Sequence, residues 1–110
     1  MVKVNIKENS WLAAIAANRL KTKRVALVLG HTIHLHGATT QELLTNKPWL
    51  LHELKHVQQY HRLGTIPFLW QYLLESIRHG YLNNRFEIEA REAEHEETLL
   101  LQHDISRYLI

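Results

Sequence analysis

The chain is 110 residues long, with 45% hydrophobic and 22% charged residues, which is the size and composition of one folded domain. Its formal net charge of +2 is too small to indicate a nucleic-acid-binding protein. The absence of cysteine excludes disulfide bonds, thiolate metal sites and cysteine nucleophiles. The nine histidines are unusual, and any metal site must use histidine and carboxylate side chains. We expect a single domain over residues 1–110.

The first predicted element is a helix from Ser10 to Leu20, with the Ser10 side chain as its N-cap. We expect Trp11, Ile15 and Leu20 to form the stripe that faces the core. The segment is short for the apolar region of a signal peptide, and no stretch approaches the about 18 apolar residues that span a bilayer. The sequence therefore predicts a soluble, cytoplasmic protein without a membrane partner.

A β-hairpin is predicted next, from the strand-like run Val25–Leu29 and the alternating run Thr32–His36, joined by a turn at Gly30. The alternation places Ile33 and Leu35 toward the core and the intervening side chains on the other face. That other face carries His34 and His36, which form a second candidate metal pair or could contact a substrate.

Helices are predicted for most of the remaining chain. After a helical turn at residues 41–44, one helix starts near Pro48 and ends at Gly64, and another covers Pro67–His79. A last helix is expected over most of Arg85–Leu109. Three histidines on these predicted helices are expected to face solvent: His61, His95 and His103. The predicted fold class is α+β and mostly α: an N-terminal helix, a small β-hairpin, then the motif-bearing helix and the C-terminal helices.

One motif carries recognisable chemistry. His52-Glu53-Leu54-Lys55-His56 matches H-E-x-x-H and falls inside a predicted helix. Residues four apart lie on one helical face, so the imidazoles of His52 and His56 can bind the same zinc ion. Glu53 follows the first ligand, within reach of a water molecule at the metal. The other faces of this helix carry apolar residues that would anchor it in the core: Leu50, Leu51, Leu54 and Val57.

A catalytic zinc site needs a third protein ligand and leaves its fourth position for water. Glu87 and Glu89 are carboxylates near the start of a predicted helix downstream of the motif, and they point about 200° apart on that helix, so only one can face the site. The predicted core face of that helix is Phe86, Ala90 and Ala93, which places Glu87 at its edge. We therefore favour Glu87 as the ligand and expect the remaining acidic residues, Glu89, Glu92, Glu94, Glu96 and Glu97, to be solvated.

The segments His52–Val57 and Asn84–Ala90 resemble the gluzincin metallopeptidases, above all the small minigluzincins and the membrane CAAX-prenyl-protease group. The resemblance implies a zincin-like mini-domain that binds one Zn²⁺ per chain, with Glu87 as the third ligand. It also implies a cleft bordered by a strand that pairs with the backbone of a peptide or protein substrate. The prenyl-protease group usually has an aspartate in contact with a zinc histidine where this chain has Arg91.

The implied activity is zinc-dependent hydrolysis of a peptide bond. Glu53 would act as general base and then general acid on a zinc-bound water. A further donor should stabilise the oxyanion, and the candidates for this or for substrate contact are Tyr72, His79, Tyr81 and Arg91.

Two alternatives remain open. The first is a non-catalytic zinc-binding module, although such a module does not require Glu53. The second is a helical protein-interaction module that uses the apolar C-terminal residues Leu99, Leu100, Leu101, Ile105 and Leu109. The same tail could instead fold over the cleft, which would keep the isolated peptidase latent. Oligomeric state is not indicated by any pattern.

Overall fold

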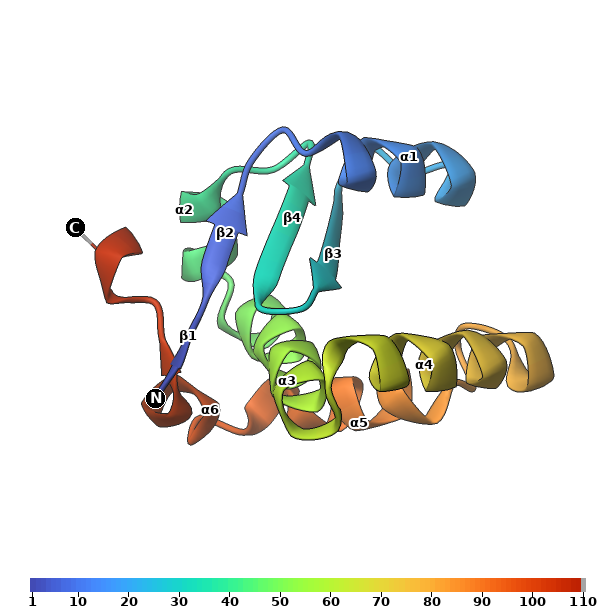
Figure 1. Cartoon of the computed structure of the whole chain (residues 1–110). Coiled ribbons are helices and arrows are strands. Elements are labelled where there is room, and N and C mark those ends of the chain that lie inside the picture. Colours follow the sequence, from blue (N-terminus) through green and yellow to red (C-terminus); the bar gives the residue numbers. More distant parts are fainter. Residues whose placement is uncertain (110) are drawn as a thin grey trace.

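The computed structural model describes residues 1–109 and has an α+β fold in which helices are the main component (Figure 1). Helix α1 packs against strands β3 and β4, and helix α3 lies beneath the sheet with α4 and α5 beside it. The helices are α1 (Trp11–Leu20), α2 (Thr40–Thr45), α3 (Lys47–Leu63), α4 (Thr65–His79), α5 (Arg85–Glu92) and α6 (Leu99–Gln102). The strands are β1 (Val2–Lys3), β2 (Asn5–Lys7), β3 (Val25–Leu29), β4 (Thr32–His36) and β5 (His103–Asp104).

The predicted hairpin is confirmed. Strands β3 and β4 pair antiparallel, with Val28 opposite Ile33, and Gly30 adopts the positive φ of +63° that the tight turn requires. Ile33 and Leu35 are fully buried, as the alternation predicts. Strand β2, which was not predicted, adds to β4 in parallel, so the order is β2-β4-β3 and β3 forms an edge of the sheet.

Helix α3 begins and ends where the sequence predicts. The Asn46 side chain accepts a hydrogen bond from the Trp49 amide at 3.3 Å, and Pro48 occupies the first turn. The helix ends at Gly64, whose φ of +88° disfavours other residues. Three of its apolar side chains, Leu51, Leu54 and Val57, are fully buried, so this helix is fixed in the core. None of the described helices has the length and apolarity needed for a membrane span.

Helix α1 packs through different residues from those predicted. The buried side chains are Ala13 and Ala17, whereas Trp11, Ile15 and Leu20 are 65%, 53% and 57% exposed. Small alanine side chains allow the helix to lie close to β3 and β4, and that close approach turns the larger side chains outward. The expectation of a Trp11–Ile15–Leu20 core stripe is therefore wrong.

The prediction of one long C-terminal helix is also wrong. Helix α5 ends at Glu92 and is followed by a 3₁₀ turn at Ala93–His95, the short helix α6, strand β5 and a second 3₁₀ turn at Ser106–Tyr108. The chain leaves the helical path at Glu96, where Glu96 and Glu97 pair with lysines of α3 at 3.4 and 2.6 Å.

The tail belongs to the core at the end of the molecule away from α1 (Figure 1). Strand β5 pairs in parallel with β1, and Ile105 is 6% exposed. His103, expected in solvent, is 1% exposed and bonds the Leu99 carbonyl through Nδ1 at 2.8 Å. The apolar tail residues are thus used largely for intramolecular packing.

This packing gives a stability prediction. Leu99 is fully buried, so Leu99→Ala should lower the free energy of unfolding by about 2–5 kcal/mol. Leu101 on the same short helix is 75% exposed, and Leu101→Ala is the matched control with a change of about 0.5 kcal/mol or less. Urea unfolding of the two variants measures the difference. Equal stability would show that the tail is not part of the core.

Candidate metal centre

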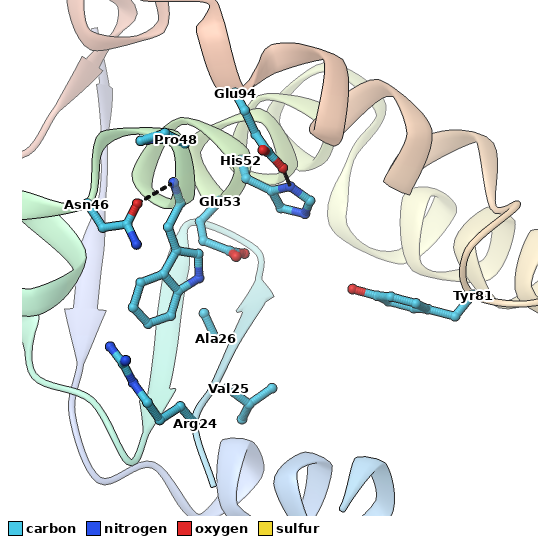
Figure 2. Close-up of a pocket in the computed structure, with 10 residues that line it drawn as sticks. Arg24, Val25, Ala26, Asn46, Pro48, His52, Glu53, Tyr81 and Glu94 are labelled. Atoms are coloured by element: carbon cyan, nitrogen blue, oxygen red, sulfur yellow. Dashed lines mark hydrogen bonds and ion pairs between the residues drawn. The ribbon is translucent and has the colours of Figure 1, made fainter. Parts of the chain in front are cut away.

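Helix α3 presents the three motif residues toward a cleft beneath β3. Glu53 and His56 are buried, with 6% and 7% exposure, and His52 is partly buried. Figure 2 shows the Glu53 carboxylate pointing into this cleft, opposite the hydroxyl group of Tyr81. Because neighbouring turns of α3 are anchored in the core, these side chains start from a rigid backbone.

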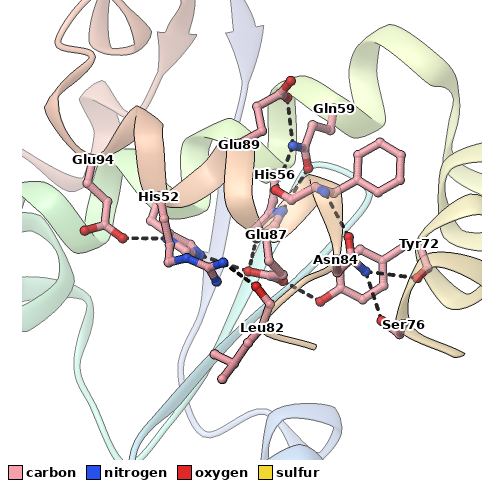
Figure 3. Close-up of polar contacts among 12 residues, drawn as sticks. His52, His56, Gln59, Tyr72, Ser76, Leu82, Asn84, Glu87, Glu89 and Glu94 are labelled. Atoms are coloured by element: carbon pink, nitrogen blue, oxygen red, sulfur yellow. Dashed lines mark hydrogen bonds and ion pairs between the residues drawn. The ribbon is translucent and has the colours of Figure 1, made fainter. Parts of the chain in front are cut away.

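His52, His56 and Glu87 form a buried group that could hold a metal ion (Figure 3). Glu87 Oε1 lies 3.2 Å from Nε2 of His52 and 3.2 Å from Nε2 of His56. Tetrahedral zinc with bonds of about 2.0 Å separates neighbouring ligand atoms by about 3.3 Å. The observed spacing between Glu87 and each histidine therefore fits such an ion.

Asn84 sets the position of Glu87. Its side-chain oxygen caps α5 by accepting a hydrogen bond from the Phe86 amide at 2.8 Å. Its side-chain nitrogen donates to the Tyr72 carbonyl at 3.1 Å and to Ser76 Oγ at 2.9 Å. These bonds fasten the start of α5 to α4. Ala90, one turn further on, is fully buried, as expected from its place on the predicted core face.

Each of the three candidate ligands has a second polar contact that orients it. His52 Nδ1 lies 2.9 Å from Glu94 Oε2, and His56 Nδ1 lies 2.9 Å from Gln59 Oε1. The Tyr72 hydroxyl donates to Glu87 Oε2. Carboxylate and amide oxygens accept hydrogen bonds, so Nδ1 of each imidazole donates to Glu94 or Gln59, and a metal ion bound at Nε2 would take the place of the proton that Nε2 shares with Glu87.

The orientation of Gln59 supports this assignment. Its Nε2 donates to the Phe86 carbonyl at 3.1 Å and to Glu89 Oε1 at 2.9 Å. With the amide nitrogen held by two acceptors, the amide oxygen faces His56. Glu89 therefore lies outside the ligand group and supports it indirectly.

Glu94 was expected in a solvated acidic face, and this expectation is wrong because its carboxylate contacts His52. Glu94 lies in the 3₁₀ turn that follows α5, and this turn brings its carboxylate to 2.9 Å from His52 Nδ1. Arg91, on the last turn of α5, donates to the Leu82 carbonyl instead.

We expect Glu94→Ala to weaken zinc affinity by about 10- to 100-fold, because an unsupported His52 loses orientation and basicity. Glu92→Ala is the matched control: it removes the same charge from an exposed position at the end of α5. Competition with a fluorescent zinc chelator measures both affinities. If Glu94→Ala binds zinc as tightly as Glu92→Ala, the carboxylate does not support the ligand.

The two glutamates at the centre have opposite electrostatic environments. Burial raises the pKa of Glu53 to about 7, although the charges of His56 and His52 act against the rise. Burial would also raise the pKa of Glu87, but hydrogen bonds from His52, His56 and Tyr72 outweigh it and hold that pKa well below its usual range. Glu87 is thus an ionised candidate ligand, whereas Glu53 can gain and lose a proton near neutral pH.

Of the residues predicted to contact the oxyanion or the substrate, some lie at the cleft and others lie away from it. Tyr81 lines the cleft, and burial of its hydroxyl group together with the Glu87 and Glu53 carboxylates raises its pKa to about 12, which keeps it a proton donor. Tyr72 is engaged with Glu87. His79, at the end of α4, is exposed and lines neither of the two pockets of the cleft described below.

His34 and His36, the alternative metal pair on β4, do not belong to any group of three candidate metal ligands among the residues that the structure describes. His34 Nδ1 instead lies 2.8 Å from Ser10 Oγ, the N-cap of α1, and burial together with the charge of Lys7 lowers the pKa of His34. His34 therefore has a structural contact at the start of α1.

The cleft consists of two pockets that meet at the candidate metal centre. The polar pocket, of about 560 Å³, is lined by Arg24, Asn46, Trp49 and Glu94 among others. The apolar pocket, of about 400 Å³, extends between α1 and α4. Five residues line both pockets, namely Val25 and Ala26 of the edge strand β3 with His52, Glu53 and Tyr81.

No protein-family model matches this chain, and no curated protein or solved structure was found to be similar to it. The resemblance to gluzincins therefore stays a prediction based on the two segments that carry it. The geometry itself defines a protein in which two histidines, one partly buried and one buried, lie with a buried glutamate in a group that could hold a metal ion.

Proposed function

We propose that this chain is a zinc-dependent peptidase. The observation that carries the proposal is the position of Glu53: a buried carboxylate that faces the cleft beside the three candidate ligands without being one of them. Two imidazoles and one carboxylate are a donor set of catalytic zinc sites, in which one coordination position stays open. A site that served only to hold the fold together would not need a further carboxylate at the cleft.

The chain supplies the proton transfers that peptide hydrolysis requires. Zinc bound by His52, His56 and Glu87 would act as a Lewis acid toward water and the substrate carbonyl. Glu53, with its pKa near 7, accepts a proton from the attacking water and delivers it to the leaving nitrogen. The Tyr81 hydroxyl, which points into the cleft (Figure 2), is the best-placed donor for the oxyanion.

The edge strand β3 offers a place for the substrate backbone. Val25 and Ala26 line both pockets, and β3 pairs with β4 on one side only. An extended peptide that hydrogen-bonds to this free edge would pass over Glu53 and the ligands.

The C-terminal tail does not cover the cleft in this arrangement. Among the described residues, none from 95 to 109 lines either pocket. The tail is instead held at the far side, where the Tyr108 hydroxyl accepts a hydrogen bond from the Ile6 amide at 2.9 Å. Latency through this segment therefore has no contact to support it, and we propose an open cleft.

A peptide-library assay tests the proposed activity. The zinc-loaded protein should cleave internally quenched peptides, 1,10-phenanthroline should stop the cleavage, and added zinc should restore it. Mass spectrometry of the products identifies the cleaved bonds. A protein that binds one zinc ion yet cleaves no member of a diverse library would favour the non-catalytic zinc-binding module.

A further inference from the structure

The cleft has two unequal halves on either side of the metal centre. The polar pocket carries the charges of Arg24 and Glu94 and the amide of Asn46. Among the described residues of the apolar pocket, Arg19 is the only charged one outside the metal centre. A peptide lying across His52 and Glu53 would therefore meet chemically different surfaces on the two sides of its scissile bond.

The apolar pocket is built by elements that meet only in the fold. Helix α1 contributes Ala16 and Leu20, helix α4 contributes Leu69 and Leu73, and β3 contributes Val28. The volume of about 400 Å³ lies within the range of about 300–1,000 Å³ found for ligand pockets. Such a pocket gains binding free energy by removing an apolar side chain from water.

Exposed apolar side chains extend this surface beyond the pocket. On α4, the residues Ile66, Trp70, Leu73, Leu74 and Ile77 are exposed, and their spacing places them on one helical face. Leu73 belongs to both the exposed face and the pocket, so the two surfaces are continuous. Because the metal centre lies at the inner end of this surface, we take its occupant to be a substrate.

We propose that the protein selects substrates with a large apolar side chain next to the scissile bond, and that this side chain occupies the apolar pocket between α1 and α4. The inference rests on the proposed peptidase function and adds the substrate class. On the other side of the scissile bond, the larger pocket with Arg24, Asn46 and Glu94 accepts polar side chains.

The binding of matched inhibitors tests this inference without relying on turnover. Two series of hydroxamates are titrated into the zinc-loaded protein by calorimetry. Each series consists of pairs of compounds: one carries an isobutyl group next to the metal-binding hydroxamate, and the other carries hydrogen at the same position. In the first series the substituted position is on one side of the hydroxamate, and in the second series it is on the opposite side. In one series, the isobutyl compound should bind at least about tenfold more tightly.

Filling the pocket should abolish this preference. Ala16→Phe places a bulky side chain in the pocket, whereas Asn18→Phe adds the same group at an exposed position of α1. The isobutyl advantage should disappear in Ala16→Phe and persist in Asn18→Phe, with about one zinc ion per chain in both. As a second route, Leu73→Lys should reduce the advantage by placing a charge at the pocket mouth.

The outcomes separate the two proposals. If zinc binds and the isobutyl compounds of both series bind no better than their partners, the substrate class is wrong although the peptidase proposal survives. The same conclusion follows if Ala16→Phe keeps its zinc and the full advantage. If the protein takes up no zinc, the proposed function fails and this inference fails with it.

Discussion

Replacing Glu53 with glutamine should reduce peptide hydrolysis by about 100- to 10,000-fold, the range expected when a general acid–base group is removed. Zinc content should stay at the wild-type level, because Glu53 lies outside the group formed by His52, His56 and Glu87. Glutamine keeps the shape of the side chain but cannot accept the proton of the attacking water. Parallel measurement of zinc by mass spectrometry and of initial cleavage rates checks both parts.

The control for this variant is Glu92→Gln, a change of the same kind at an exposed position on α5. It should retain both zinc and the full cleavage rate. A Glu53→Gln protein that keeps its zinc and cleaves as fast as this control would remove Glu53 from the mechanism. If zinc were lost together with activity, Glu53 would be part of the metal site instead.

Replacing Glu87 with alanine should lower the zinc content from about one ion per chain to near zero, because two imidazoles alone make a weak site. The change also removes the carboxylate that His52, His56 and Tyr72 all contact. Circular dichroism before the zinc measurement establishes whether the variant is folded. Glu87→Gln is a second variant of nearly equal volume, and it should also bind zinc weakly.

Glu89 provides the matched comparison because it lies on the same helix as Glu87. Its carboxylate accepts a hydrogen bond from Gln59, which is not a candidate ligand. Glu89→Ala should retain most of its zinc. The reverse pattern, with zinc lost in Glu89→Ala and kept in a folded Glu87→Ala, would assign the third ligand to Glu89. Zinc retained in both variants would move the third ligand to another part of the chain.

Local signals in the sequence predict the parts of the fold that local chemistry determines. Pro48 and Gly64 mark the ends of α3, and the glycine turn with alternating Ile33 and Leu35 identifies the hairpin. The spacing of His52 and His56 on one helical face follows from the helix period alone. Each of these features depends only on residues close together in the chain, so a single sequence is enough to predict it.

The errors concern contacts between distant segments. Strands β1 and β2 are very short and pair in parallel with residues far along the chain, although the alternation of Val2, Val4 and Ile6 was a signal for them. The burial of Ala13 and Ala17 in α1 depends on how closely the helix approaches the sheet, which its own sequence does not state.

The support of the metal centre was the least predictable part of the site. Glu94 resembles the neighbouring solvated glutamates in sequence, and its contact with His52 depends on the 3₁₀ turn that follows α5. Gln59 and Asn84 act through contacts that join α3, α4 and α5. Such contacts depend on the packing of helices and not on any local motif.

The most direct test of this account is the zinc content of the purified wild-type protein and of His56→Ala, measured by inductively coupled plasma mass spectrometry after zinc loading and removal of free metal. We predict about one zinc ion per wild-type chain and near zero in a His56→Ala variant that keeps the wild-type circular dichroism spectrum. A wild-type protein without zinc, or a His56→Ala variant that retains it in full, would contradict the metal centre on which the proposed function depends.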